Sequence, residues 1–169
     1  MNLNGIEIER KFLIAAPEKQ WLDEQPGSRR VVILQTYLLS PPGETRRIRE
    51  WSENGKTRYI RTIKRPLTGI TREELEDEIT EAEYSALLKE KDPQRRQIEK
   101  TRWCIPYEGH VLEIDHYAQW YDDRSTLEVE LESEEEIFRI PPEIEIIREV
   151  TGDPRYLNSS MAREFPPRD

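Results

Sequence analysis

The chain of 169 residues contains one cysteine, Cys104, and only two histidines, His110 and His116. A lone cysteine cannot form an intramolecular disulfide and is typical of a reducing compartment, so we expect a cytoplasmic protein. A zinc site is not expected with so few thiol and imidazole ligands. No activating histidine can be assigned to Cys104, which we interpret as a packed residue. His110 is expected at an exposed turn, and His116 is interpreted as structural.

Long apolar runs are also absent. No stretch approaches eighteen consecutive apolar residues, which excludes a membrane-spanning helix. The first nine residues lack a basic region followed by an apolar one, so no secretory signal is predicted. The Gly-x-x-x-x-Gly-Lys-Ser/Thr and Gly-x-Gly-x-x-Gly motifs do not occur either, so the sequence offers no backbone cradle for phosphate.

Charged residues, in contrast, make up 36% of the chain: 26 are basic and 35 acidic, which gives a formal net charge of −9. The acidic balance argues against nucleic-acid binding, which normally uses a basic face. A mean hydropathy of −0.88 could indicate disorder. However, four Trp, seven Tyr and three Phe are spread among Ile, Leu and Val. We therefore expect one folded domain over residues 1–169, with the tryptophans in core and cover positions.

Alternation of period two predicts that most of the chain forms strands. Asn54-Gly55 and Glu108-Gly109 indicate tight turns between neighbouring strands. Eight strands with few helices predict a mainly β protein (α+β) whose antiparallel sheet forms a closed or nearly closed barrel. The expected strands are 6–12, 30–39, 45–51, 57–64, 71–79, 97–106, 110–117 and 124–131.

Helical spacing predicts a small number of covering helices, at residues 17–24, 81–91, 143–150 and 153–163. In the last of these, Asp153 is the expected cap and Pro154 the first helical residue. Ser133 and Glu136 have the spacing of a capping box, which predicts a further short helix.

The expected strands carry their charges on one face. In strand 6–12, Glu7, Glu9 and Lys11 alternate with apolar residues. On any single strand this pattern is typical of the solvated side of an ordinary sheet. It recurs on six strands with both signs of charge, which favours a barrel whose charged face lines a water-filled lumen, since isolated charges cannot be buried dry.

A lumen of this kind needs a ligand with matching charges. Guanidinium and ammonium groups at this density suit a chain of phosphates. Carboxylates repel phosphate unless a hard cation such as Mg²⁺ or Mn²⁺ lies between them, so the mixed set predicts a metal–polyphosphate complex. The basic members are Lys11, Arg47, Arg49, Lys64, Arg72, Lys100 and Arg102, and the acidic members are Glu7, Glu9, Glu74, Glu76, Glu113, Asp115, Glu128 and Glu130.

The segment Glu7-Ile8-Glu9-Arg10-Lys11 resembles the Glu-x-Glu-x-Lys signature of the CYTH superfamily, also called triphosphate tunnel metalloenzymes. Companion motifs follow in order, and the resemblance extends over residues 5–163. Two positions depart from the pattern: Thr36 stands where many relatives have glycine, and Trp103 where tyrosine is usual. The companion motifs are Gln35-Thr36-Tyr37-Leu38, Arg47-Ile48-Arg49, Thr62-Ile63-Lys64, Arg72-Glu73-Glu74-Leu75-Glu76, Glu99-Lys100-Thr101-Arg102-Trp103, Leu112-Glu113-Ile114-Asp115, Leu127-Glu128-Val129-Glu130-Leu131, and the ending Glu149-Val150-Thr151 with Asp153 and Arg155-Tyr156-Leu157-Asn158.

The resemblance implies an eight-stranded antiparallel β-tunnel that binds a triphosphate with a divalent metal. Lys100, paired with Tyr37, would take part in activating water. The resemblance also implies that Lys11, Arg47, Arg49, Lys64, Arg72 and Arg102 bind phosphates, that Glu7, Glu9, Glu130 and Glu128 hold Mg²⁺ or Mn²⁺, and that Glu74, Glu76, Glu113 and Asp115 orient the basic side chains or help a second metal.

Activities known in this family are inorganic triphosphatase, thiamine-triphosphatase, RNA 5′-triphosphatase and class IV adenylyl cyclase. We expect hydrolysis of inorganic triphosphate to pyrophosphate and phosphate. A cyclase would need a base pocket and a means to position a ribose 3′-hydroxyl, and no residue set clearly supplies either. A non-catalytic polyphosphate- or nucleotide-binding module would share every clamp residue. The sequence leaves open whether Lys100 is a general base or a further clamp, and it does not specify the oligomeric state.

Overall fold

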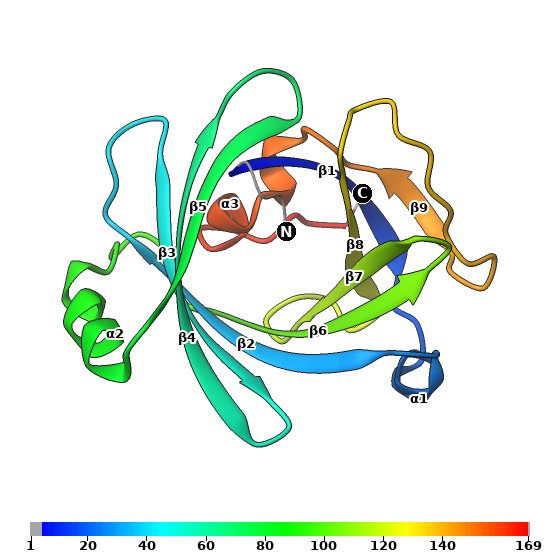
Figure 1. Cartoon of the computed structure of the whole chain (residues 1–169), viewed down its shortest axis with the longest axis horizontal. Helices are drawn as coiled ribbons and strands as arrows, with labels where there is room; N and C mark the ends of the chain where they lie inside the picture. Colours follow the sequence, from blue (N-terminus) through cyan, green and yellow to red (C-terminus); the bar gives the residue numbers. More distant parts are fainter. Residues whose placement is uncertain (1–4, 169) are drawn as a thin grey trace.

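Eight long antiparallel strands dominate the computed structural model, which describes residues 5–168 (Figure 1). All eight strands predicted from the alternation are present, with bounds shifted by a few residues. The predicted turns are confirmed at Asn54-Gly55 and Glu108-Gly109, where all four residues have positive φ. The strands are β1 Ile6–Ala15, β2 Arg29–Leu38, β3 Thr45–Glu53, β4 Lys56–Pro66, β5 Thr71–Ile79, β6 Ile98–Tyr107, β7 His110–Tyr117 and β8 Arg124–Leu131.

The sheet closes on itself through β1. The strands run in the order β5-β4-β3-β2-β6-β7-β8-β1, and an additional pairing joins β5 to β1. The first strand serves both neighbours because Glu7 lies opposite Arg72 of β5, while Glu9 lies opposite Glu130 of β8. The expected closed eight-stranded antiparallel barrel is therefore confirmed, and the first and last of its strands are adjacent (Figure 1).

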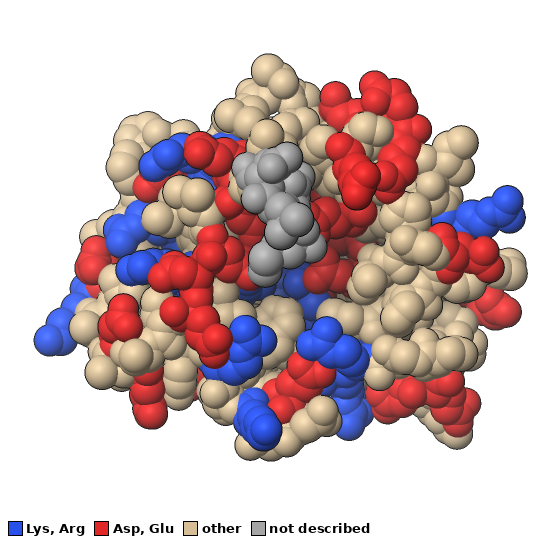
Figure 2. All heavy atoms as spheres, viewed as in Figure 1, with Lys and Arg blue, Asp and Glu red and all other residues tan. Residues whose placement is uncertain are grey.

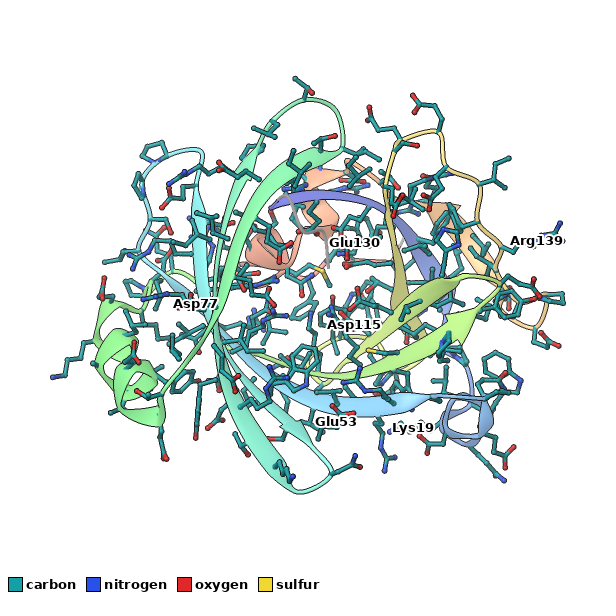
Figure 3. All side chains as sticks on the ribbon, in the orientation of Figure 1. Lys19, Glu53, Asp77, Asp115, Glu130 and Arg139 are labelled. Carbon is teal, nitrogen blue, oxygen red and sulfur yellow. The ribbon has the colours of Figure 1, made fainter. Side chains whose placement is uncertain are left out.

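The charged face of the strands lines the inside of this barrel. Residues paired across neighbouring strands lie on the same face of the sheet. The pairs Lys11–Glu128 and Arg102–Asp115 therefore place charged side chains of adjacent strands on the face that lines the lumen. Asp115 and Glu130 lie toward the interior in Figure 3, whereas Arg139 projects away from it. Several of the inward charges are buried; Lys100 is only 2% exposed.

The apolar face points outward, under covering segments. On β1, β6, β7 and β8 it forms one buried cluster, which includes Trp103 and is covered by Leu22 of α1 (Lys19–Glu24) and by Ile144. On the opposite side of the barrel, Tyr84 of α2 (Glu81–Leu87) packs on Ile48. Burial of this outer face holds the fold together, which leaves the lumen available for polar groups.

The helix predicted at 81–91 is present as α2, followed by the 3₁₀ helix η1 (Leu88–Glu90). It begins at a capping box in which the Thr80 side chain accepts a hydrogen bond from the Glu83 backbone N–H. Leu38 forms an isolated bridge with Lys91, which joins the end of this segment to the barrel. Within residues 5–168, no helix combines the length and apolar character needed to cross a membrane.

Two helix predictions are wrong. The 143–150 segment contains β9 (Ile146–Glu149), which pairs with β1 between Phe12 and Ile14. Pairing with β5 covers only the start of β1, so the later part of that edge is available for β9, and these long-range hydrogen bonds override the local helical spacing. The segment around Ser133 forms a turn instead of a helix, because the Glu136 carboxylate accepts from Glu132 N–H and contacts His110.

The C-terminal prediction is confirmed in part. Asp153 caps the segment by accepting from the Arg155 backbone N–H at 3.0 Å, and Pro154 occupies the first helical turn. In place of one continuous helix, however, the chain forms the 3₁₀ helix η2 (Pro154–Tyr156) and the short helix α3 (Asn158–Met161). An extended residue, Leu157, separates the two. This break brings Asn158 to the tunnel.

Candidate active site

The lumen contains a cavity of about 1200 Å³. Figure 2 shows acidic and basic side chains lying side by side on this face of the molecule. All the predicted site residues line the cavity except Asp115, which lies in the wall behind Lys100 and Arg102. The tunnel therefore brings together side chains that are up to about 120 positions apart in the sequence, such as Glu7 and Glu128.

Two arginines of β3 hold buried donors that have no partner. The Nε atoms of Arg47 and Arg49 are buried and donate to no atom of residues 5–168. Arg49 contacts Glu76 through Nη2 at 3.2 Å and stacks on the Trp51 ring at 5.4 Å. Burial lowers the pKa of Arg49 to about 10, and the neighbouring Arg47 guanidinium adds to the shift. This part of the tunnel therefore holds buried donors that the protein does not satisfy, which suits an anion.

On the opposite wall, Arg102 and Lys100 share one carboxylate. Arg102 donates to both oxygens of Asp115, from Nε at 2.7 Å and from Nη2 at 2.9 Å, and its Nη1 reaches Glu113 at 2.6 Å. The Lys100 Nζ lies 2.9 Å from Asp115 Oδ2. Despite its burial, the pKa of Asp115 is lowered to about 2 by Arg102 and Lys100. Both oxygens of Asp115 are therefore occupied by basic side chains, which favours the expected orienting role over a role as metal ligand.

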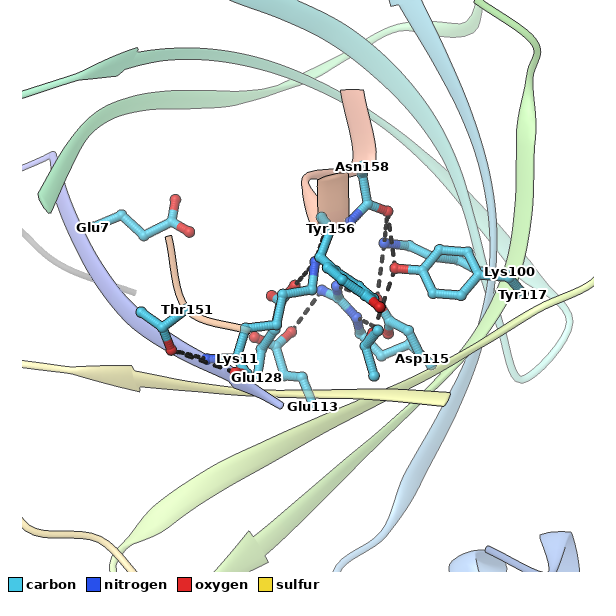
Figure 4. A network of polar contacts seen from close by, with 12 residues as sticks. Glu7, Lys11, Lys100, Glu113, Asp115, Tyr117, Glu128, Thr151, Tyr156 and Asn158 are labelled. Carbon is cyan, nitrogen blue, oxygen red and sulfur yellow. Dashed lines mark hydrogen bonds and ion pairs between the residues drawn. The ribbon is translucent and has the colours of Figure 1, made fainter. Parts of the chain in front are cut away.

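Lys100 is the buried cation with a pKa nearest to neutrality. Burial lowers the pKa of Lys100 to about 7, Asp115 opposes this shift, and the Arg102 guanidinium adds to it. Its Nζ donates to Asn158 Oδ1 at 3.1 Å, and the Tyr117 ring lies 5.6 Å from Nζ (Figure 4). Tyr37 lines the same cavity, and its hydroxyl accepts from Gln35 Nε2 at 2.8 Å, so its expected pairing with Lys100 stays a prediction. The residue directly opposite Lys100 in the strand register is Tyr117.

Carboxylates crowd the part of the tunnel formed by β1, β5 and β8. Lys64 contacts Glu7 at 3.1 Å, and Lys11 contacts Glu128 at 3.0 Å. These pairs leave other carboxyl groups under repulsion. Burial raises the pKa of Glu9 well above its usual range, and Glu128 and Glu7 add to the shift. Burial and a hydrogen bond with Glu7 raise the pKa of Glu74 to about 9.

The same carboxylates fit a hard divalent cation in their chemistry. They are oxygen donors, and Glu9 and Glu74 are buried close enough to neighbouring carboxyl groups for their pKa values to be raised. In their present rotamers, no three such side chains within residues 5–168 are grouped closely enough to enclose an ion. Glu7, Glu9 and Glu130 would therefore have to turn toward a common point to hold the metal, while Glu128 remains paired with Lys11.

Among the residues of the site that were not expected from the sequence are Trp51, Tyr117 and Asn158. Trp51, predicted as core or cover, lines the cavity, since it lies on the same face of β3 as Arg47 and Arg49. Tyr117 shares its inward face with Asp115 by the same spacing, which the sequence does show. Asn158 carries no comparable pattern, because it reaches the tunnel from outside the barrel strands.

The remaining candidates are structural, but one differs in exposure from the prediction. Burial raises the pKa of Cys104 to about 11, so its thiol stays protonated and is not a nucleophile. His116 contacts the Ser125 hydroxyl at 3.2 Å, outside the lumen. The exposed His110 that we expected is instead half-buried, with its side chain only 16% exposed and held at 2.5 Å from Glu136.

The fold and the lumen define a class of protein: a closed β-tunnel lined with charges of both signs. Comparison with known families agrees, since residues 5–165 match the CYTH domain. The chain belongs to the CYTH domain family.

Two curated relatives are similar along nearly their whole length. An inorganic triphosphatase of Acetivibrio thermocellus is 34% identical over 159 residues, which cover 94% of each chain. An inorganic triphosphatase of Nitrosomonas europaea is 31% identical, with 95% of this chain and 99% of that protein covered.

Solved structures show the same fold. A crystal structure of an inorganic triphosphatase superposes with a TM-score of 0.60 at 30% identity and covers 95% of this chain and 97% of its own. A protein of Pyrococcus horikoshii has a TM-score of 0.58 at 23% identity over 75% of this chain and 80% of its own, and at that identity it supports the fold alone.

Proposed function

We propose that this chain, as a single CYTH-type domain, hydrolyses inorganic triphosphate to pyrophosphate and phosphate inside its tunnel, with Mg²⁺ or Mn²⁺. The observation that carries the proposal is that buried donors in the lumen lack acceptors while buried carboxyl groups there lie under mutual repulsion. Arg47 and Arg49 hold unpartnered donors, while Glu9 and Glu74 have raised pKa values. A small phosphate chain with a divalent cation satisfies both sides at once.

Substrate binding follows from the buried cations. The orphaned Nε groups of Arg47 and Arg49 would donate to phosphate oxygens, and Arg102, held rigidly by Asp115, would present its planar donors to the same chain. Lys11, Lys64 and Arg72 line the same cavity and add positive charge. Because these groups are fixed before the substrate arrives, they would stabilise charge at the transferred phosphoryl group with little reorganisation.

Lys100 is the group best placed to take a proton from the attacking water. A general base must be unprotonated near neutral pH, and a pKa of about 7 leaves a large fraction of its amine neutral. Glu7, Glu9 and Glu130 would hold the divalent cation, which when bound supplies neutralisation of the phosphate oxygens. Tyr37 lines the cavity and contacts Gln35, so we assign it to the tunnel wall.

A phosphate-release panel tests this proposal. The purified chain is incubated with inorganic triphosphate, ATP, thiamine triphosphate, pyrophosphate and long polyphosphate, each with Mg²⁺, Mn²⁺ or Ca²⁺. We expect fastest release from inorganic triphosphate, with one phosphate and one pyrophosphate formed per substrate. Faster turnover of ATP to a cyclic nucleotide would replace the proposal with a cyclase, and tight triphosphate binding without turnover would replace it with a binding module.

The cellular compartment is proposed on a separate observation. Cys104 is buried and has no disulfide partner, which suits the reducing cytoplasm.

A further inference from the structure

A side chain from beyond the barrel reaches into the centre of the site. Asn158, at the start of α3, places its Oδ1 atom 3.1 Å from Lys100 Nζ and 3.1 Å from the Tyr117 hydroxyl (Figure 4). One amide oxygen thus accepts from two tunnel residues, on β6 and on β7. Asn158 also lines the main cavity.

The effect of this contact depends on the protonation state of the Lys100 amine. A neutral lysine amine has two N–H donors and one lone pair, whereas the ammonium form has three donors and no lone pair. Asp115 Oδ2 at 2.9 Å and Asn158 Oδ1 at 3.1 Å provide two acceptors around the nitrogen. When both N–H groups are used in this way, the lone pair is left for a water molecule in the cavity.

Tyr117 determines which end of the Asn158 amide faces Lys100. Burial raises the pKa of Tyr117, so its hydroxyl stays protonated and donates to the Asn158 oxygen. If the amide were turned over, its NH₂ group would face both the Tyr117 hydroxyl and the Lys100 amine and would engage the lone pair that the reaction needs. The tyrosine therefore favours the productive orientation of the amide.

The position of Asn158 is itself fixed by contacts between the C-terminal segment and the barrel. The Tyr156 carbonyl oxygen accepts from Lys11 Nζ at 2.5 Å, and the Ser159 carbonyl oxygen accepts from Arg95 Nε at 2.9 Å. The Ala162 carbonyl oxygen accepts from the Arg96 N–H at 2.8 Å. Asn158 thus lies between anchors on both sides, so its oxygen is held by backbone as well as side-chain contacts.

We propose that Asn158 is a positioning residue that directs the lone pair of the neutral Lys100 amine toward the attacking water, so that the C-terminal segment completes the active site. This inference rests on the proposed triphosphatase function, because in that reaction the lone pair must be directed at the attacking water. Asn158 contacts Lys100 and does not need to touch the substrate. The charged or titratable groups that also act on Lys100 are Asp115, Arg102, Glu128, Arg47 and Tyr117.

Two variants at one position separate positioning from packing. Asn158→Ala removes the acceptor, and we expect kcat to fall about 10- to 100-fold with little change in KM, since a misdirected catalytic group costs rate and not affinity. Asn158→Asp keeps the shape but places a carboxylate beside the amine. We expect it to raise the pKa of Lys100 and to move the acidic limb of the kcat profile upward by about one pH unit or more.

The matched control is Ser160→Ala on the same short helix, whose side chain has no role in the site; its kcat, KM and pH profile should match those of wild type. A second readout does not depend on activity. In metal-free protein, the Lys100 ¹³Cε chemical shift is followed against pH by NMR, with Lys100→Arg used to assign the signal. Asn158→Asp should titrate about one unit or more above wild type.

Each outcome decides one question. Wild-type protein that releases no phosphate from any triphosphate would overturn the proposed function. Active wild type, together with Asn158→Ala and Asn158→Asp variants that keep its kcat and its pH profile, would overturn only the role of Asn158. A packing role would give a different pair of results. Asn158→Ala would lose both kcat and the near-ultraviolet circular dichroism signal of the folded protein, and a folded Asn158→Asp variant would leave the titration of Lys100 unchanged. That pair of results would also overturn the inference.

Discussion

Arg102 and Asp115 form a two-pronged ion pair across β6 and β7, with Nε–Oδ1 at 2.7 Å and Nη2–Oδ2 at 2.9 Å. Asp115 is 1% exposed and Arg102 8% exposed. Fixed donors of this kind cost little reorganisation when a phosphate arrives, because the guanidinium plane is already set by the carboxylate behind it. The same pair is part of the buried charge network of the tunnel, so its removal should lower the free energy of unfolding.

Asp115→Asn should strongly destabilise the protein. The substitution leaves Arg102 and Lys100 buried without their shared negative partner, and breaking a buried ion pair in this way costs about 3 kcal/mol or more. The matched control is Asp77→Asn, which removes the exposed pair of Asp77 with Arg61 and should cost less than about 1 kcal/mol. Urea unfolding followed by circular dichroism measures both. Equal effects of the two substitutions would show that the buried network is not a major source of stability.

Removal of divalent metal should abolish turnover. With excess chelator we expect no phosphate release from inorganic triphosphate, and full recovery on addition of Mg²⁺ or Mn²⁺. Glu7→Gln and Glu9→Gln should be nearly inactive even with metal, because each loses a charged oxygen ligand. Glu78→Gln, whose partner is the exposed Arg58, provides the control and should be active. Undiminished activity in chelator would remove the metal from the mechanism.

Triphosphate should stabilise the folded chain against heat. Ligand that binds only the folded state adds about 2.7 kcal/mol at one hundred times its dissociation constant. The effect should shrink at high salt, since the contacts are ionic. Arg49→Gln removes a donor with an unpartnered Nε atom and should weaken the response, whereas Arg58→Gln, on the exposed pair with Glu78, should leave it intact. Differential scanning fluorimetry at several salt concentrations tests both expectations, and a melting temperature indifferent to millimolar triphosphate would contradict the site.

The pH profile should report the amine of Lys100. Its folded-state pKa of about 7 lies below the ordinary lysine value, so the neutral base is lost as pH falls through about 7 and gained as pH rises. We therefore expect kcat to increase with pH through this range and then to level. In Lys100→Ala a lost base lowers kcat with little change in triphosphate affinity. A variant that binds poorly but turns over normally at saturation would make Lys100 a clamp instead.

Much of the fold follows from local patterns in the sequence. Alternation of period two in segments such as 6–12 and 124–131 predicted strands that the structure confirms, and Asn54-Gly55 predicted its hairpin. Alternation also predicted the inward face, because side chains on one strand point to opposite sides whatever the surroundings. The charged residues that line the lumen, from Glu7 to Glu130, could therefore be predicted from the sequence alone.

The helix errors show where local patterns stop being sufficient. The 146–149 segment has helical spacing, yet it is a strand because an open edge of β1 offers hydrogen-bond partners from a distant part of the chain. The 133–136 segment has a capping signal, but its Glu136 side chain is engaged by His110. In both cases a partner remote in sequence competes with the local preference.

What the sequence by itself determined was the identity of the charged groups and the face of the barrel on which they lie, since both depend only on residue type and strand periodicity. The tertiary structure alone decided which groups touch. It placed Tyr117 and Asn158 beside Lys100, because strand register and the path of the C-terminal segment determine neighbours across the tunnel. It also decided the proton affinity of Lys100, because burial is a property of the closed barrel and not of any short stretch of sequence.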